Sequence, residues 1–123
     1  MNTRFVLLIL ILSFSACRTN SGGSEIEKQD YEMAFDKVKW KVKDGADYPH
    51  RDKMLNDLVS NDTVRSLSKS EIMNLLGEPD RANENYLYYM VKQRRIRSWP
   101  LHTKTMVIKL SENETIEWIK IHE

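Results

Sequence analysis

Residues 67–80 constrain the fold more than any other part of the sequence, because they contain a helix together with both of its boundaries. Ser68 and Glu71 have the spacing of a capping box, in which each side chain accepts a hydrogen bond from the other residue's backbone amide. Gly77 can end the helix in a left-handed conformation, and Pro79 prevents the helix from resuming. A helix this short is marginal in water, so it must pack its apolar face on another element. That face carries Ile72, Met73, Leu75 and Leu76.

Two segments before this helix have contrasting patterns. Residues 37–43 alternate between lysine and an apolar residue, which predicts an extended segment that could join a sheet. The lysines are typical of a guarded strand edge, and the alternative is a basic stripe that binds a membrane surface or an acidic partner. Residues 49–59 have helical spacing instead. We expect Met54, Leu55, Leu58 and Val59 on the buried face, and Arg51, Asp52, Lys53, Asn56 and Asp57 on the solvent face.

Three β-rich segments follow the capped helix, at residues 85–91, 103–110 and 115–121. In the third, Ile116 and Trp118 share one face while Ile119 and Ile121 share the other, which a bulge or apolar contacts on both sides would explain. Successive strands with short links pair antiparallel, and the helices need a surface to cover. The predicted fold is therefore α+β, with two short helices packed on one face of a three-stranded antiparallel sheet in a single domain of residues 31–123.

The start of the chain has the pattern of an export signal. Arg4 precedes an apolar run over residues 5–14, and small residues follow before Cys17, the only cysteine. Residues 14–17 resemble the lipobox of bacterial lipoproteins, with an ordinary secretory peptide as the alternative. The resemblance implies a signal peptide of residues 1–16 and several acyl chains, such as palmitate, on Cys17. Those chains would anchor the protein to a membrane, and Arg18 in place of aspartate favours the outer membrane.

Charge and composition limit the classes of partner. Removal of residues 1–16 would leave 18 basic and 18 acidic residues, a balance that gives no electrostatic footprint for nucleic acid. Residues 17–30 contain Gly22 and Gly23 among polar residues and read as a lipidated cysteine followed by a flexible tether.

The order of anchor, two helices, a Leu-Gly-x-Pro exit and three strands resembles the SmpA/OmlA family, which includes lipoprotein E of the outer-membrane barrel-assembly machine. The resemblance rests on residues 67–72 and 75–79, followed by Tyr86 and the segments 107–110 and 115–121. It covers about half of the chain. The family shares its ααβββ unit with β-lactamase inhibitory proteins. Because the matching motif is mainly a capped helix and its exit, the resemblance implies an architecture and carries over no binding residue.

The sequence shows no catalytic or metal-binding constellation. His50, His102 and His122 are isolated, without a second histidine, cysteine or clustered carboxylates at ligand spacing. There is also no glycine-rich phosphate loop and no serine in a nucleophile elbow. We therefore expect no enzymatic activity, no cofactor, no metal and no small-molecule substrate.

One stretch is a candidate binding site. Residues 93–104 connect the first two predicted strands and contain four basic residues, a tryptophan and no acidic residue. Arginine and tryptophan are enriched at interface hot spots and also suit an anionic headgroup layer. The alternative is a solvated loop with Trp99 and Pro100 folded back on the core. The candidate partner- or headgroup-binding residues are Arg94, Arg95, Arg97, Trp99 and Lys104.

A second, weaker candidate is the group Tyr86, Tyr88 and Tyr89, of which we expect at least one face in the core. Taken together, these features predict a non-enzymatic lipoprotein that binds another envelope protein, in outer-membrane protein assembly or envelope maintenance. The alternative is an inhibitor or sensor of a periplasmic enzyme that uses the same ααβββ unit.

Overall fold

A computed structural model describes residues 32–123 of the chain. The expected signal peptide, the lipidated Cys17 and the tether up to residue 30 lie outside these residues. Four short helices come first, α1 (Lys37–Lys41), α2 (Arg51–Ser60), α3 (Asp62–Arg65) and α4 (Lys69–Leu76). Four strands follow, β1 (Arg81–Asn83), β2 (Tyr86–Ile96), β3 (Trp99–Leu110) and β4 (Ile116–His122).

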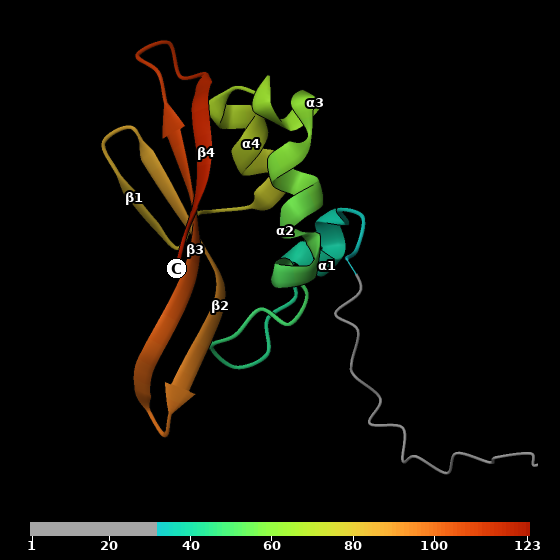
Figure 1. Ribbon diagram of the computed structural model, residues 1–123. Helices are drawn as coiled ribbons and strands as arrows, with labels where there is room; N and C mark the ends of the chain where they lie inside the picture. Colours follow the sequence, from blue (N-terminus) through green and yellow to red (C-terminus); the bar gives the residue numbers. More distant parts are fainter. Residues whose placement is uncertain (1–31) are drawn as a thin grey trace, which may run out of the picture.

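The strands form one antiparallel sheet in the order β1-β2-β3-β4. Figure 1 shows the helices on one side of this sheet and no helix on the other side. The fold is therefore α+β with helices covering one face of an antiparallel sheet, as predicted. The described domain has two more helices and one more strand than the prediction of two helices and three strands.

The core lies between the helices and the sheet. Trp40, Met54, Leu58, Ile72 and Leu76 from the helices are buried against the sheet residues Leu87, Tyr89, Val91, Met106, Ile108, Leu110 and Ile119. The predicted apolar faces of the helices at 49–59 and 68–76 are confirmed, although Val59, Met73 and Leu75 are only partly buried. Tyr89 is fully buried, and its hydroxyl donates a hydrogen bond to the Gly77 carbonyl at 2.8 Å.

The capped helix α4 has the boundaries that its sequence predicts. Ser68 Oγ accepts from the Glu71 amide at 3.3 Å, and the Glu71 carboxylate accepts from the Ser68 amide at 2.9 Å. At the other end, Gly77 has φ +84° and donates its amide to the Met73 carbonyl at 2.8 Å. The predicted caps at both ends of α4 are therefore present in the structure.

The prediction of an extended segment over residues 37–43 is wrong, because this segment contains helix α1. The Asp36 carboxylate caps the helix by accepting from the amides of Val38 and Lys39 at 2.8 and 3.0 Å. Trp40 is buried, whereas Val38 is 76% exposed. The cap and the burial of one large indole outweigh the period-two pattern of the lysines.

The prediction that Arg51 lies on the solvent face of its helix is also wrong. Arg51 is only 3% exposed, and its guanidinium lies 4.7 Å from the Trp40 ring centroid and 3.3 Å from that of Tyr48. Its Nε donates to the Trp40 carbonyl at 3.0 Å, and its Nη1 donates to the Met90 carbonyl at 2.7 Å and to Asp80 Oδ2 at 3.2 Å. These partners satisfy the buried cation, so burial is tolerated at this position.

The strands differ from prediction mainly in length. Residues 93–104 were predicted as a loop, but β2 and β3 continue through them to a two-residue turn at Arg97 and Ser98. Arg97 takes φ +57°, the left-handed conformation that such tight turns use. In β4, the register shifts so that Ile116 pairs with Leu110 and Trp118 pairs with Lys109. Ile116 therefore packs on the core as Ile119 does, while Trp118 lies on the other face. The bulge, one of the two predicted explanations, is confirmed.

Candidate binding surface on the β2–β3 hairpin

The outer hairpin, which we define as residues 92–104, extends beyond the helices that cover the rest of the sheet (Figure 1). Its two strands pair only with each other, as in the cross-strand pairs of Arg94 with His102 and Ile96 with Trp99. Register shifts occur between Met90 and Lys92 and between Arg94 and Arg95. Such irregularities increase strand twist and redirect side chains, so the outer hairpin is not a simple continuation of the inner sheet.

The tip of the outer hairpin exposes large apolar side chains. Trp99 is 78% exposed, Leu101 66% and Ile96 61%. These three residues, with Arg97 and Pro100, line a shallow hollow. Trp99 and Pro100 therefore do not fold back on the core, and the tip offers apolar area that no residue of the described domain covers.

Three cations at the base of the outer hairpin are tied to the rest of the domain. The Lys92 and Lys104 ammonium groups contact the Asp52 carboxylate of α2 at 3.2 and 3.0 Å. Lys104 also contacts Glu123 at 2.6 Å, and Arg95 contacts Asp47 at 3.7 Å. These contacts fasten the base of the hairpin to the helical layer and to the end of β4.

The ion pairs at the base of the hairpin shift two pKa values. Burial alone would raise the pKa of Asp52, but the ammonium groups of Lys104 and Lys92 lower it below its usual value. The carboxylates of Glu123 and Asp52 raise the pKa of Lys104. Both shifts favour the charged forms of Asp52 and Lys104.

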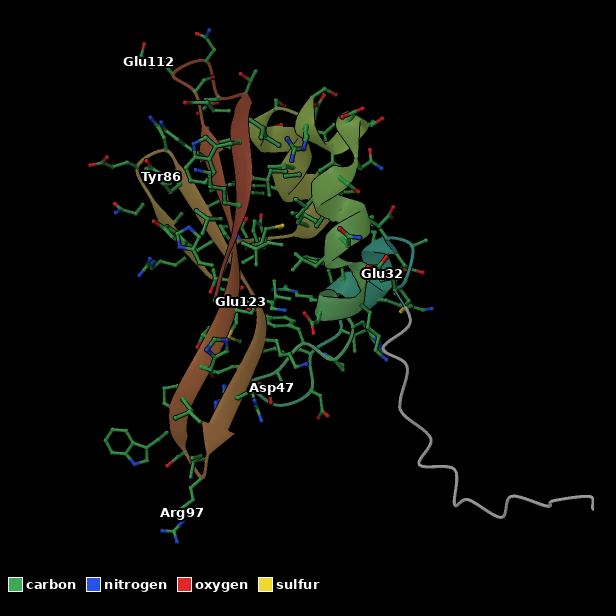
Figure 2. All side chains as sticks on the ribbon, in the orientation of Figure 1. Glu32, Asp47, Tyr86, Arg97, Glu112 and Glu123 are labelled. Atoms are coloured by element: carbon green, nitrogen blue, oxygen red, sulfur yellow. The ribbon has the colours of Figure 1, made fainter. Side chains whose placement is uncertain are left out.

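Arg94 and Arg97 differ from the other cations because neither forms an ion pair within residues 32–123. Figure 2 shows Arg97 at the extreme end of the hairpin, directed away from the domain. The sequence from Asn85 to Ser111 contains no acidic residue, so β2 and β3 supply no internal counter-charge. The outer hairpin thus combines an exposed apolar tip with two unpaired guanidinium groups.

All five predicted site residues lie on the outer hairpin, but they do not form one cluster. Arg97 and Trp99 belong to the tip, whereas Arg95 and Lys104 are fastened to Asp47, Asp52 and Glu123. The sequence analysis did not single out Ile96 and Leu101 as site residues. Apolar residues interleaved with arginines in a stretch without acidic residues were the available signal for both.

The tyrosine group is divided between the two faces of the sheet. Tyr89 points into the core, where burial raises the pKa of its phenol well above the usual range. Tyr86 and Tyr88 are partly exposed and lie on the opposite face of the sheet, and Figure 2 shows Tyr86 on the side away from the helices. The expectation that part of this group is in the core is confirmed.

No set of three or more histidine, cysteine or acidic side chains within residues 32–123 is arranged to hold a metal ion. In the same range, no helix has the length and apolar character needed to cross a membrane. Comparison with known proteins found no match to a protein-family model, to a curated protein or to a solved structure.

Proposed function

We propose that this chain is a non-enzymatic, lipid-anchored protein of the cell envelope, and that it binds another envelope protein through the outer hairpin. The observation that carries this proposal is the exposed tip of Ile96, Trp99 and Leu101, with the unpaired Arg97 at the tip and the unpaired Arg94 farther along β2. Solvent-exposed tryptophan beside arginine is the composition of an interface hot spot. The anchor itself is proposed from the signal and lipobox pattern that ends at Cys17.

The geometry of the tip defines the kind of partner surface that would fit. A projecting hairpin needs a concave apolar site, because a flat surface would leave most of the exposed indole in water. The two arginines favour carboxylates around that site, since charge-assisted and bidentate pairs form readily between arginine and carboxylate. The proposed partner surface is thus an apolar hollow with an acidic rim.

The ion pairs at the base of the outer hairpin contribute to binding because they hold the tip in a fixed position. Asp52 receives both Lys92 and Lys104, so the strands that carry the tip are held against α2 before any partner binds. A pre-organised element loses less conformational entropy on binding than a flexible loop. The cations at the base therefore position the tip, while Arg94 and Arg97 are available to the partner.

The sequence resemblance to the SmpA/OmlA family supports the proposal of a role in outer-membrane assembly or maintenance. A second candidate function, inhibition or sensing of a periplasmic enzyme, is favoured by the same projecting shape. A narrow tip with an exposed indole suits an enzyme cleft as well as a hollow on an assembly factor.

Crosslinking in cells followed by detergent extraction tests the proposal. The native chain is compared with Arg94→Gln/Arg97→Gln, with a control that removes two positive charges elsewhere, Arg81→Gln/Lys120→Gln, and with Cys17→Ala. We expect one envelope protein to be recovered with the native chain and the control, and to be lost with the hairpin variant.

Three results would change the assignment. Equal recovery of the envelope protein with the hairpin variant and the native chain would show that the outer hairpin is not the binding site. Recovery of the same membrane-bound partner with Cys17→Ala would show that the anchor is dispensable for binding. A soluble enzyme recovered in a one-to-one complex with either form would favour the inhibitor function.

A further inference from the structure

The sheet has a second exposed surface, on the side that the helices leave uncovered. We call it the open face and define it by Tyr86, Tyr88 and Trp118 together with Arg81 and Lys120. These residues share one side of the sheet, since Arg81 pairs with Tyr88 across strands and Lys109 pairs with both Tyr86 and Trp118. Figure 1 shows that no helix lies over this side.

Three aromatic rings on the open face are in contact with one another. The Tyr86 ring lies 6.4 Å from Tyr88 at an interplanar angle of 29°, and 6.0 Å from Trp118 at 62°. All three residues are partly exposed. The rings therefore form a continuous aromatic row on a surface of the described domain that is otherwise open to solvent.

A cation lies over each end of this row. The Arg81 guanidinium is 4.1 Å from the Tyr88 centroid, and the Lys120 ammonium is 4.6 Å from the Trp118 centroid. Neither forms an ion pair with another residue of the range 32–123, whereas the neighbouring Lys109 is paired with Glu117 at 3.2 Å. Both end cations can therefore pair with an external anion at little cost in existing contacts.

The row of rings ends at a hollow of about 350 Å³, within the size range of small-ligand sites. Met90 and Val107 supply its apolar part, and Tyr88 borders it. The Thr105 hydroxyl and the His122 imidazole also line it, and neither side chain has a hydrogen-bond partner within the described domain.

The acidic side chain at the edge of this hollow is already occupied. Asp80 Oδ1 accepts from the Tyr48 hydroxyl at 2.9 Å, and its Oδ2 accepts from Arg51 and from the Met90 amide at 3.2 and 2.7 Å. Its charge is largely compensated by Arg51. The hollow therefore presents the Tyr88 ring, free hydrogen-bonding groups and the Arg81 guanidinium, with little negative charge to repel an anion.

We propose that the open face binds an acidic glycan, with sugar rings stacked on the aromatic row and an anionic substituent paired with Arg81 or Lys120. A sugar ring has an apolar face of C–H groups and hydroxyls at its edge. The face can pack on Tyr86, Tyr88 and Trp118, while the hydroxyls bond Thr105 and His122. A carboxylate, sulfate or phosphate on the sugar supplies the counter-charge that the unpaired cations lack.

Two features argue against other anionic ligands with flat rings. Single-stranded nucleic acid also stacks on aromatic side chains, but it carries one phosphate per nucleotide and needs a cationic track along its path. The open face has only two unpaired cations, and the whole chain has a net charge of only +1. A sugar chain carries its acidic groups on the rings and not in the linkages, so one or two of them can pair with these cations while the others stay in water.

The test uses the full chain, purified in a nonionic detergent, and calorimetric titration with oligogalacturonate, which carries a carboxylate on each sugar. The fully methyl-esterified form of the same oligosaccharide is the neutral comparison, chondroitin sulfate is a sulfated one, and oligothymidylate of equal length is the nucleic-acid comparison. We expect binding of the acidic glycans, weaker binding of the ester, and weaker binding of oligothymidylate.

Variants then locate the site. Trp118→Ala removes one end of the aromatic row, and Arg81→Gln/Lys120→Gln removes both cations through exposed side chains whose loss leaves the fold intact. Each variant should weaken binding of oligogalacturonate at least about tenfold. Arg94→Gln/Arg97→Gln removes the same number of charges from the outer hairpin and should leave the affinity within about twofold.

Several results would overturn the proposal. Failure of both carboxylated and sulfated glycans to bind would exclude the ligand class. If the open-face and hairpin variants weaken oligogalacturonate binding equally, the binding results from general charge attraction and not from a site on the open face. Tighter binding of oligothymidylate than of either glycan would reassign the face to nucleic acid. Loss of the outer-hairpin partner has no bearing on these outcomes, because the aromatic row and its two cations share no residue with the outer hairpin, and only Thr103 of the hairpin lines the hollow.

Discussion

Substitution of Arg51 by methionine tests how the helical layer is joined to the sheet. The guanidinium connects three elements, since it bonds the carbonyl of Trp40 in α1, the carbonyl of Met90 in β2 and the carboxylate of Asp80 just before β1. Methionine keeps the apolar stem of the side chain but not the guanidinium that lies against the Trp40 and Tyr48 rings. The substitution therefore removes the hydrogen bonds, the charge and these ring contacts.

The expected cost follows from those contacts. A hydrogen bond to a charged group contributes about 1.5–3 kcal/mol, and removing one partner of a buried ion pair costs about 3–5 kcal/mol. Part of the loss is offset, because burial opposes the charged state of Arg51 and lowers its pKa. Asp80 is also partly exposed, so water can replace one bond. We expect Arg51→Met to lower the free energy of unfolding by about 3–5 kcal/mol.

Urea denaturation followed by circular dichroism provides the measurement, with Asp80→Asn as the matched variant. Asparagine can still accept from Arg51 and the Met90 amide, so its cost should be smaller, about 1–3 kcal/mol. The double variant should cost less than the two single variants together, because both remove the same pair. A cost below about 1 kcal/mol for Arg51→Met, or strict additivity, would refute the reasoning.

Three further predictions address other parts of the domain. Leu76→Ala should lower the free energy of unfolding by about 2–5 kcal/mol in urea denaturation, because Leu76 is buried, and Leu75→Ala should cost less because Leu75 is only partly buried. Gly77→Ala should cost about 1–3 kcal/mol by the same assay, since φ +84° and ψ −173° suit glycine almost alone; an unchanged midpoint would contradict this. The folded state lowers the pKa of Asp52, so its contribution is complete above the unfolded value of about 3.9 and is lost as the pH falls through the lower folded value. Hydrogen-exchange protection in the outer hairpin, taken relative to the intrinsic exchange rate at each pH, should fall over that acidic range in the native chain, whereas Asp52→Asn, which loses the carboxylate at Lys104, should show less protection at neutral pH and little further acid dependence.

Local signals predicted the elements whose stability depends on neighbouring residues in the chain. The capping box of Ser68 and Glu71 and the exit at Gly77 depend on contacts within a few residues, and the spacing of apolar residues within α2 defines its buried face; each is present in the structure. The bulge in β4 was one of two predicted explanations, because Ile116 and Trp118 would lie on one face of a regular strand and Ile119 and Ile121 on the other. Sequence therefore specified most of the buried scaffold.

The remaining elements depend on contacts between distant parts of the chain. Helix α1 exists because Trp40 reaches the core and Asp36 caps the helix, whereas the spacing of its lysines imitates a strand. Arg51 is buried because its partners Trp40, Asp80 and Met90 come from three other segments. Periodicity within a single window carries no information about such partners.

The candidate surface was only partly predictable for a similar reason. The sequence indicated residues 93–104 by charge and by the presence of Trp99, but it could not separate the fastened cations from the free ones. That distinction depends on Asp47, Asp52 and Glu123, which lie far away in sequence and neutralise Arg95, Lys92 and Lys104. Only after these pairs are assigned do Arg94 and Arg97 remain for a partner.

The proposed function requires that the partner protein binds the tip of the outer hairpin. The most direct measurement places a photo-crosslinking amino acid at Trp99 in cells, with the same probe at the exposed Thr63 of α3 as the control. We expect a discrete adduct with one envelope protein from position 99 that is absent from position 63 and is lost when Arg94 and Arg97 are replaced by glutamine. The same adducts from both positions, or an adduct from position 99 that persists without the arginines, would contradict the claim.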